Sequence, residues 1–204
     1  MNYELFTAFV LITIILILTP GPVVTLVIAT GASHGIRAGL TTVLGTTVGN
    51  AILLALIATG LNWVLNNAVA VFEILRWAGA AYLVWLGIQA WRGAGKALDV
   101  PPPRRRVHFG RGVVVALTNP KTIAFFTAFL PQFIDPTLPA GQQLFVMCAV
   151  SVLVAWIIDS GWAVAAGMGR AFFLKPSRAR FLARLSGLAL IGGGIWLSLA
   201  RRPA

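Results

Sequence analysis

The feature that most constrains this chain is a pair of proline breaks inside two long apolar segments. The first is Leu18-Thr19-Pro20-Gly21-Pro22, and the second is Leu117-Thr118-Asn119-Pro120-Lys121 at the matching place in the other half. Proline has no amide hydrogen, so each break frees backbone carbonyls one turn earlier. Within lipid, freed backbone groups survive only where protein or a water-filled cavity covers them. The paired breaks therefore predict a path through a membrane.

Composition supports a membrane protein. Of the 204 residues, 58% are hydrophobic and 10% are charged, and apolar runs reach the length of about 20 residues that a membrane-spanning helix needs. The net charge of +11 does not indicate nucleic-acid binding, because the basic residues fall in short segments between apolar spans. The single cysteine, Cys148, has no partner for a disulfide and is interpreted as a small packing residue.

The hydropathy pattern predicts an all-α fold with six transmembrane helices. The first span is kept as mature structure, because residues 1–5 carry Glu4 and no basic residue, and its apolar region is longer than that of a signal peptide. The six expected spans are residues 3–31, 38–61, 69–91, 112–133, 142–169 and 181–200.

The distribution of basic residues predicts the orientation. Segments 32–37, 92–111 and 170–184 hold 12 of the 16 lysines and arginines, whereas segments 62–68 and 134–141 hold none. The positive-inside rule therefore places the first, third and fifth connections in the cytoplasm and the N-terminus outside. Arg201 and Arg202 oppose this assignment at the C-terminus.

The chain divides into two units of three spans. Residues 92–111 contain glycines, three consecutive prolines and three consecutive arginines, and we interpret them as a basic cytoplasmic linker between residues 1–91 and 112–204. Because three is odd, the second unit lies upside down relative to the first, which is the inverted repeat of many secondary transporters. The first and fourth helices are then the broken ones. The alternative is two unrelated proline kinks.

The breaks supply groups suited to a zwitterion. Half-helix ends present amides to an anionic group, and unwound carbonyls can hold an ammonium group. We expect Pro20 and Pro22 to free carbonyls near residues 16 and 18, with Gly21 permitting the turn. The candidate pathway residues at the breaks are Thr19, Pro20, Gly21, Pro22, Thr118, Asn119, Pro120 and Lys121.

Charged and polar residues within the spans complete the candidate site. Asp159 is the acidic residue deep within a span, and an intramembrane carboxylate marks a functional site by default. We take Asp159 as the counter-charge of Lys121 and as the candidate proton-coupling group. A fixed Lys121–Asp159 salt bridge that only joins two helices is the alternative. Asn50 either lines the cavity or bonds across helices.

Other residues favour structural roles. Gly31, Gly35 and Gly39, and likewise Gly45 and Gly49, have the spacing that lets membrane helices pack closely. His34 and His108 lie in basic connections, where solvent or lipid headgroups are expected, so no metal site is predicted. Phosphate-loop, zinc-protease and nucleophile-elbow motifs are missing from the sequence, so neither an enzyme nor a cofactor is predicted.

Several motifs together resemble the LysE/RhtB family of amino-acid exporters. They run in order along almost the whole chain: residues 19–22, 35–39, Gly45 with Gly49, residues 77–83, Leu86-Gly87, residues 119–121 and residues 125–133. The resemblance implies a bacterial inner-membrane exporter that moves amino acids or related metabolites outward in exchange for protons, with a homodimer as a candidate assembly. It also implies an acidic residue in the fifth span, where Asp159 lies.

Two alternatives stay open beside the exporter. One is a membrane scaffold without transport activity, or an enzyme subunit, whose charged residues only pack helices. The other is a cation or metal exporter, which the scarcity of metal ligands in the spans disfavours. Because few acidic groups lie in the spans, a neutral amino acid is favoured over a strongly cationic substrate.

Overall fold

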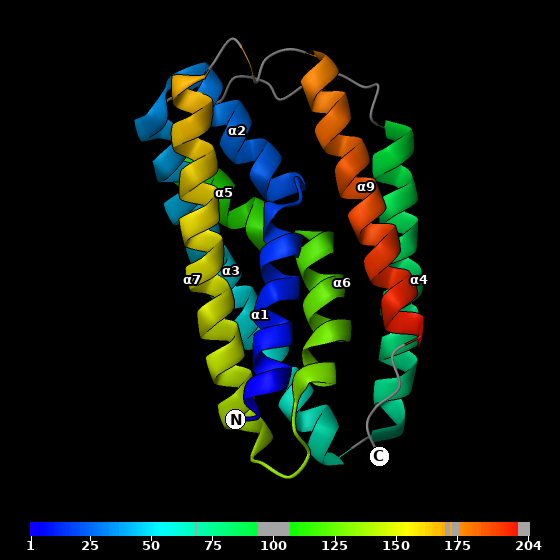
Figure 1. The fold of residues 1–204 in the computed structure, drawn as a ribbon. Coiled ribbons are helices and arrows are strands. Elements are labelled where there is room, and N and C mark those ends of the chain that lie inside the picture. The colour runs from blue at the N-terminus through cyan, green and yellow to red at the C-terminus, as the bar shows by residue number, and fades with distance from the viewer. Residues whose placement is uncertain (68, 94–106, 170–171, 173–175, 200–204) are drawn as a thin grey trace.

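The computed structural model describes residues 1–67, 69–93, 107–169, 172 and 176–199 (Figure 1). Every regular element in these residues is a helix, which confirms the all-α fold for this part of the chain. The elements are α1 (Tyr3–Leu18), α2 (Pro22–His34), α3 (Ile36–Asn67), α4 (Val69–Arg92), α5 (His108–Leu117), α6 (Pro120–Phe129), the short 3-10 helix η2 (Leu130–Phe133), α7 (Ala140–Met168) and α9 (Pro176–Leu199).

Both proline breaks interrupt a helix where the sequence predicts it. The chain bends by 48° between α1 and α2 and by 42° between α5 and the segment of α6 and η2. At each break a threonine hydroxyl donates a hydrogen bond to the carbonyl one turn earlier, from Thr19 to Ile15 at 2.6 Å and from Thr118 to Val114 at 2.8 Å. A proline then opens the next helix. The two breaks are therefore built alike.

By length and composition alone, the described residues support fewer membrane spans than the six predicted. Two helical segments in the described residues, Ile36–Leu65 and Ala140–Met168, are long and apolar enough to cross a membrane, and four result if each bent pair is one span. The apolar part of α9, Ala183–Leu199, is shorter. Helix α3 also runs beyond the expected end at residue 61, because residues 62–67 contain no glycine or proline to stop it.

The segment between α4 and α5 is shorter than the expected linker of residues 92–111. Arg92 ends α4, and α5 begins at His108 rather than at the expected residue 112. Residues 94–106, which carry the proline and arginine runs, lie outside the described residues, as do Arg201 and Arg202.

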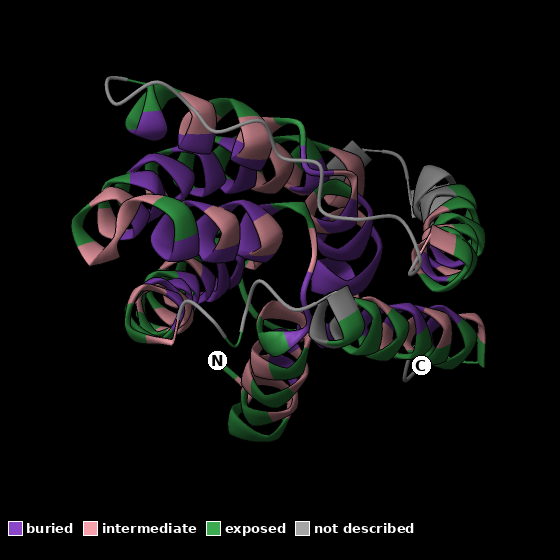
Figure 2. Cartoon of the chain, turned by 90° about the horizontal axis from the view of Figure 1, so that it is seen from above, coloured by how far each residue is buried: buried purple, intermediate pink, exposed green. Residues whose placement is uncertain are grey.

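The outer surface is strongly apolar. Seen from above, buried positions concentrate where helices face one another and exposed positions line the outside (Figure 2). Many exposed positions are large hydrophobic residues, including Leu56 at 66%, Ile74 at 69% and Phe145 at 74% exposure. A water-soluble monomer rarely exposes so much apolar surface, so this surface fits contact with the hydrocarbon of a membrane.

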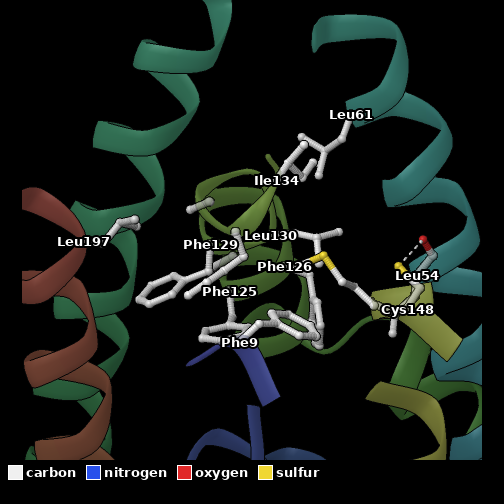
Figure 3. Close-up of a cluster of buried hydrophobic side chains, with 14 of the residues drawn as sticks. Phe9, Leu54, Leu61, Phe125, Phe126, Phe129, Leu130, Ile134, Cys148 and Leu197 are labelled. Atoms are coloured by element: carbon white, nitrogen blue, oxygen red, sulfur yellow. Dashed lines mark hydrogen bonds between the residues drawn. The ribbon is translucent and has the colours of Figure 1, made fainter. Parts of the chain in front are cut away.

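The main core surrounds α6. Phe9 of α1 packs edge-to-face on Phe126 and Phe133, with ring centroids 6.5 and 5.6 Å apart. Figure 3 shows Phe9 and Phe126 close together between the helices, beside Phe125 and Phe129. Cys148 of α7 is buried in the same cluster, and its thiol lies 3.7 Å from the carbonyl of Leu54. The interpretation of Cys148 as a packing residue is confirmed by this burial. The core fixes α6 against α1, which positions the second break beside the first.

Two glycines of α3 permit close packing on α5. A Cβ added to Gly45 would overlap the carbonyl of Phe109, and one added to Gly49 would lie 2.6 Å from the carbonyl of Val113. The predicted packing role of this pair is confirmed. Because α5 leads into the second break, these glycines also fix the position of that break.

We expect Gly45→Ala to destabilise the fold by about 1–3 kcal/mol, the usual cost of overpacking a dense interior. Thermal unfolding of the purified protein in detergent measures this effect. Gly60→Ala on the same helix is the matched control, because an added Cβ there meets no heavy atom within 4 Å. An equal melting temperature for the two variants would contradict the close packing.

The expectation that both histidines face solvent or headgroups is wrong for His108. Its side chain is only 5% exposed, and its ring centroid lies 5.2 Å from that of His34. His34 ends α2 and His108 begins α5, so the pair lies where these two helices meet. Sequence position alone did not reveal this contact, because it depends on how α5 folds back onto α2.

Candidate functional site

The first break has two carbonyls that accept hydrogen bonds from the Lys121 ammonium. Nζ of Lys121 lies 2.6 Å from the carbonyl oxygen of Leu16 and 2.5 Å from that of Thr19. In an uninterrupted helix the amide of residue 20 would bond to the carbonyl of Leu16, but Pro20 has no amide hydrogen. The ammonium takes the place of that amide, beside the backbone amide of Thr19, which donates to the same Leu16 carbonyl at 3.2 Å. Leu16 matches the carbonyl expected from sequence, and Thr19 takes the place expected for residue 18.

The second break holds Lys121 in the first turn of α6. The side-chain oxygen of Asn119 accepts a hydrogen bond from the backbone amide of Lys121 at 3.2 Å, which is the geometry of a helix N-cap. The side-chain amide of Asn119 donates to the Thr122 hydroxyl at 2.8 Å. Asn119 thus uses both of its side-chain groups to fix the start of α6.

The two breaks touch each other through Gly21 and Lys121. A Cβ added to Gly21 would lie 3.0 Å from Cδ of Lys121, so a larger residue at position 21 would press on the lysine stem. Lys121 itself is 7% exposed. The kinked segments of the two halves therefore meet in the interior.

A small cavity lies on one side of Lys121. This Asp159 cavity has a volume of about 50 Å³. A water molecule occupies about 30 Å³ in the liquid, so the cavity accommodates water but not an amino acid. The polar side chains that line it are Asn50, Asn119, Lys121, Thr122, Ser151 and Asp159.

Asp159 is not fixed in a salt bridge with Lys121. Its side chain is 2% exposed, and its Oδ1 atom accepts no hydrogen bond from any described residue. The ammonium of Lys121 instead binds the carbonyls of the first break. The alternative of a fixed Lys121–Asp159 bridge is therefore wrong for this structure. Both charges face one cavity, so a small movement of the lysine would change its partner.

The beginning of α2 also faces the Asp159 cavity. Val23 and Val24, in the first turn of α2, line it together with Asp159. The first amides of a helix have no intrahelical acceptor, and the dipole of the helix places partial positive charge there. A carboxylate at Asp159 is thus faced by an ammonium and by a helix N-terminus. The ammonium faces it across the cavity without a direct ion pair.

Two larger cavities lie on the other side of the breaks. The α2-side cavity, of about 410 Å³, is lined by both breaks and by residues of α2, α4 and α9. The α1-side cavity, of about 360 Å³, is lined by residues of α1, α4, α6 and α9. Both volumes fall within the range of about 300–1,000 Å³ that is usual for small-molecule sites.

The structure brings most of the predicted site residues together. Pro20, Gly21, Pro22, Pro120 and Lys121 line the α2-side cavity; Thr19 lines the α1-side cavity; and Gly21, Asn50, Asn119, Lys121 and Asp159 line the Asp159 cavity. Thr118 is the exception. It is exposed, and its hydroxyl donates to its own helix.

Comparison with known proteins identifies the family. The family model of the LysE type translocator matches residues 14–201. The chain belongs to this family. The resemblance drawn from the sequence motifs is thereby confirmed.

Curated relatives of this translocator cover nearly its whole length. A homoserine/homoserine lactone efflux protein of Salmonella typhimurium strain LT2 is 35% identical over 206 residues, which is 98% of this chain and 99% of the relative. A leucine efflux protein of Enterobacter sp. strain 638 is 30% identical, over 92% of this chain and 89% of the relative. An uncharacterized membrane protein of Vibrio cholerae is 32% identical over 98% of this chain. No solved structure matches the chain.

Sequence reasoning missed several polar residues that line the cavities of the translocator. Gln89 of α4, Ser186 of α9 and Thr25 of α2 line the α2-side cavity. Ser151 lies two helical turns before Asp159 on α7 and lines the Asp159 cavity. Each is a polar residue within an apolar helix, which is the signal that marks an interior-facing position in a membrane protein. That signal is weak for serine and threonine, because their hydroxyls also bond to their own helix.

Proposed function

We propose that this translocator exports neutral amino acids or closely related zwitterions across the bacterial inner membrane in exchange for protons. The observation that carries the proposal is the contact between the two breaks, where Lys121 of α6 binds the freed carbonyls at the end of α1. Lys121 lies between the α2-side cavity, which is large enough for an amino acid, and the water-sized cavity that Asp159 lines. The efflux activities named for the relatives agree with this function.

The geometry supports a mechanism in which Lys121 changes partners. A substrate carboxylate entering the α2-side cavity attracts the ammonium of Lys121 away from the carbonyls of Leu16 and Thr19. Those carbonyls, having lost the ammonium as a donor, then bind the substrate's own ammonium group. Both charged groups of a zwitterion are bound in this way by groups that pair with each other when no substrate is present.

Asp159 couples this exchange to protons. While Lys121 lies on the carbonyls of the first break, Asp159 carries a proton, because it is buried and no described residue donates a hydrogen bond to its Oδ1 atom. When the substrate ammonium takes those carbonyls, the Lys121 ammonium moves between the substrate carboxylate and Asp159, and the nearer positive charge expels the proton. Release of the substrate returns Lys121 to the carbonyls, and Asp159 takes up a proton again. Substrate and proton thus occupy the site in turn, as exchange requires.

The proposal includes the arrangement of the two halves in the membrane. The unit of residues 1–91 contributes α1 with α2, α3 and α4, and the unit of residues 112–204 contributes most of α5 with α6, α7 and α9. These form six spans as two inverted repeats, with the N-terminus outside. The similar construction of the two breaks supports the repeat, because each has a bend, a threonine bonded to its own helix and a proline that opens the next helix.

Efflux from loaded cells tests this function. Cells are preloaded with leucine or homoserine from a dipeptide, and the external amino acid is measured with and without the protein. We expect faster efflux with the protein, and we expect a protonophore to remove the increase. The scaffold alternative predicts equal efflux in both strains for every amino acid tested. Efflux that resists the protonophore would contradict proton exchange while leaving export intact.

A further inference from the structure

The α1-side cavity is an apolar chamber that the proposed mechanism does not use. Ile12 and Ile15 of α1 form one wall, and Phe125 and Phe129 of α6 form another. Helix α9 closes the chamber opposite them. Its volume of about 360 Å³ would accommodate an apolar group much larger than a methyl group.

Two of the three consecutive glycines of α9 create this space. A Cβ added to Gly192 would meet no heavy atom within 4 Å, and one added to Gly193 would meet only the ring edge of Phe129 at 3.7 Å. Gly194 differs, because its Cβ would lie 2.8 Å from the carbonyl of Ala80 on α4. The third glycine therefore serves helix packing, whereas the first two leave the chamber open.

Aromatic rings form a continuous wall of the chamber. Phe125 stacks on Phe129 with centroids 4.4 Å apart, and Phe129 stacks on Trp196 of α9 at 5.4 Å. Rings held in this way present a rigid apolar surface at low entropic cost to a bound group. The chamber thus has the lining of a binding site for an apolar side chain.

The chamber adjoins the groups that bind the substrate in the proposed mechanism. Leu190 lines both the α1-side and the α2-side cavity. One face of α9 therefore runs from Ser186 through Leu190 to Trp196, a distance of about 15 Å at the rise of an α-helix. Leu16 and Thr19, whose carbonyls bind Lys121, also line the α1-side cavity. A solute held at those carbonyls can extend an apolar group into the chamber.

We infer that the α1-side cavity binds the side chain of the exported amino acid, so that large apolar side chains such as those of leucine, methionine or phenylalanine are preferred over homoserine. This inference rests on the proposed function and adds the substrate class to it. A polar side chain in the chamber would lose its hydrogen bonds to water and find, among the described lining side chains, only the Thr19 hydroxyl and the Trp196 indole as polar groups.

Filling the chamber from Gly192 tests the inference. The experiment compares leucine and homoserine efflux from proteoliposomes for the wild type, Gly192→Leu and Gly192→Ala. We expect Gly192→Leu to reduce leucine efflux about tenfold or more while homoserine efflux is retained, because excluding even one methylene from an apolar pocket is worth about tenfold in selectivity. We expect Gly192→Ala to have a small effect on both, because its Cβ would meet no heavy atom within 4 Å. Retained homoserine efflux also demonstrates that the variant is folded.

A binding measurement keeps the test independent of how the variant folds. Leucine should raise the melting temperature of the purified wild-type protein more than homoserine does at equal concentration. Equal loss of both substrates in Gly192→Leu, or unchanged leucine efflux, would overturn the inference and leave the exporter in place. A wild type that exports homoserine but no apolar amino acid would do the same. A wild type that exports neither class would overturn the proposed function as well.

Discussion

Lys121→Met is expected to reduce amino-acid efflux to the background of cells without the protein. Methionine has a similar length and fits an apolar site, but it cannot donate to the carbonyls of Leu16 and Thr19 or bind a substrate carboxylate. The fold is expected to persist, because the Leu16 carbonyl keeps the Thr19 amide as a donor. The Thr19 carbonyl left without a donor costs about 1–3 kcal/mol, while the desolvation cost of a buried charge is removed. Efflux from loaded cells measures the loss, at protein levels matched in the membrane.

Lys121→Arg is the matched variant. It keeps a positive charge and several donors but replaces the slender lysine head with a planar one. We expect partial efflux, because the guanidinium can still bind backbone carbonyls, although the close approach of Gly21 to the lysine stem restricts it. Size-exclusion profiles of the two purified variants separate a folding defect from a transport defect. Normal efflux by Lys121→Met would contradict the role assigned to this residue.

The breaks were predictable because their cause is local. Pro20 and Pro120 lack amide hydrogens wherever the rest of the chain lies, so the bends and the freed carbonyl of Leu16 follow from the sequence alone. The donor that satisfies this carbonyl did not follow, because Lys121 is 105 residues away. Which lysine rotamer and which partner prevail depends on the rotation of α6 against α1, which the core around Phe9 and Phe126 determines.

The relation between Lys121 and Asp159 likewise depends on tertiary packing that the sequence does not specify. Because few other charges lie within the spans, the sequence predicted that these two residues lie near each other. Both line the Asp159 cavity. The sequence could not distinguish a direct ion pair from two charges that share a cavity. The glycines of α9 were missed for a related reason. Gly192 and Gly194 are alike in sequence, but Gly192 borders a cavity and Gly194 packs on α4. This difference depends on which helix lies opposite each glycine, and the sequence does not specify that.

Asp159→Asn is expected to abolish efflux driven by a proton gradient while leaving the protein folded. Asparagine has the shape of aspartate and can form hydrogen bonds in the same small cavity, but it cannot take up and release a proton. Exchange of labelled for unlabelled amino acid across the membrane needs no net proton movement, so we expect it to persist. Proteoliposomes with an imposed pH gradient measure the first activity, and counterflow without a gradient measures the second.

Ser151→Ala is the matched control for Asp159→Asn. Ser151 lines the same cavity from the same helix, but its hydroxyl donates to the carbonyl of Met147 at 2.7 Å and carries no charge. We expect this variant to keep gradient-driven efflux. If Asp159→Asn also kept it, proton coupling would have to lie elsewhere in the chain. If Asp159→Asn lost counterflow as well, Asp159 would be required for substrate binding rather than for coupling, because exchange needs a complete binding site but no proton.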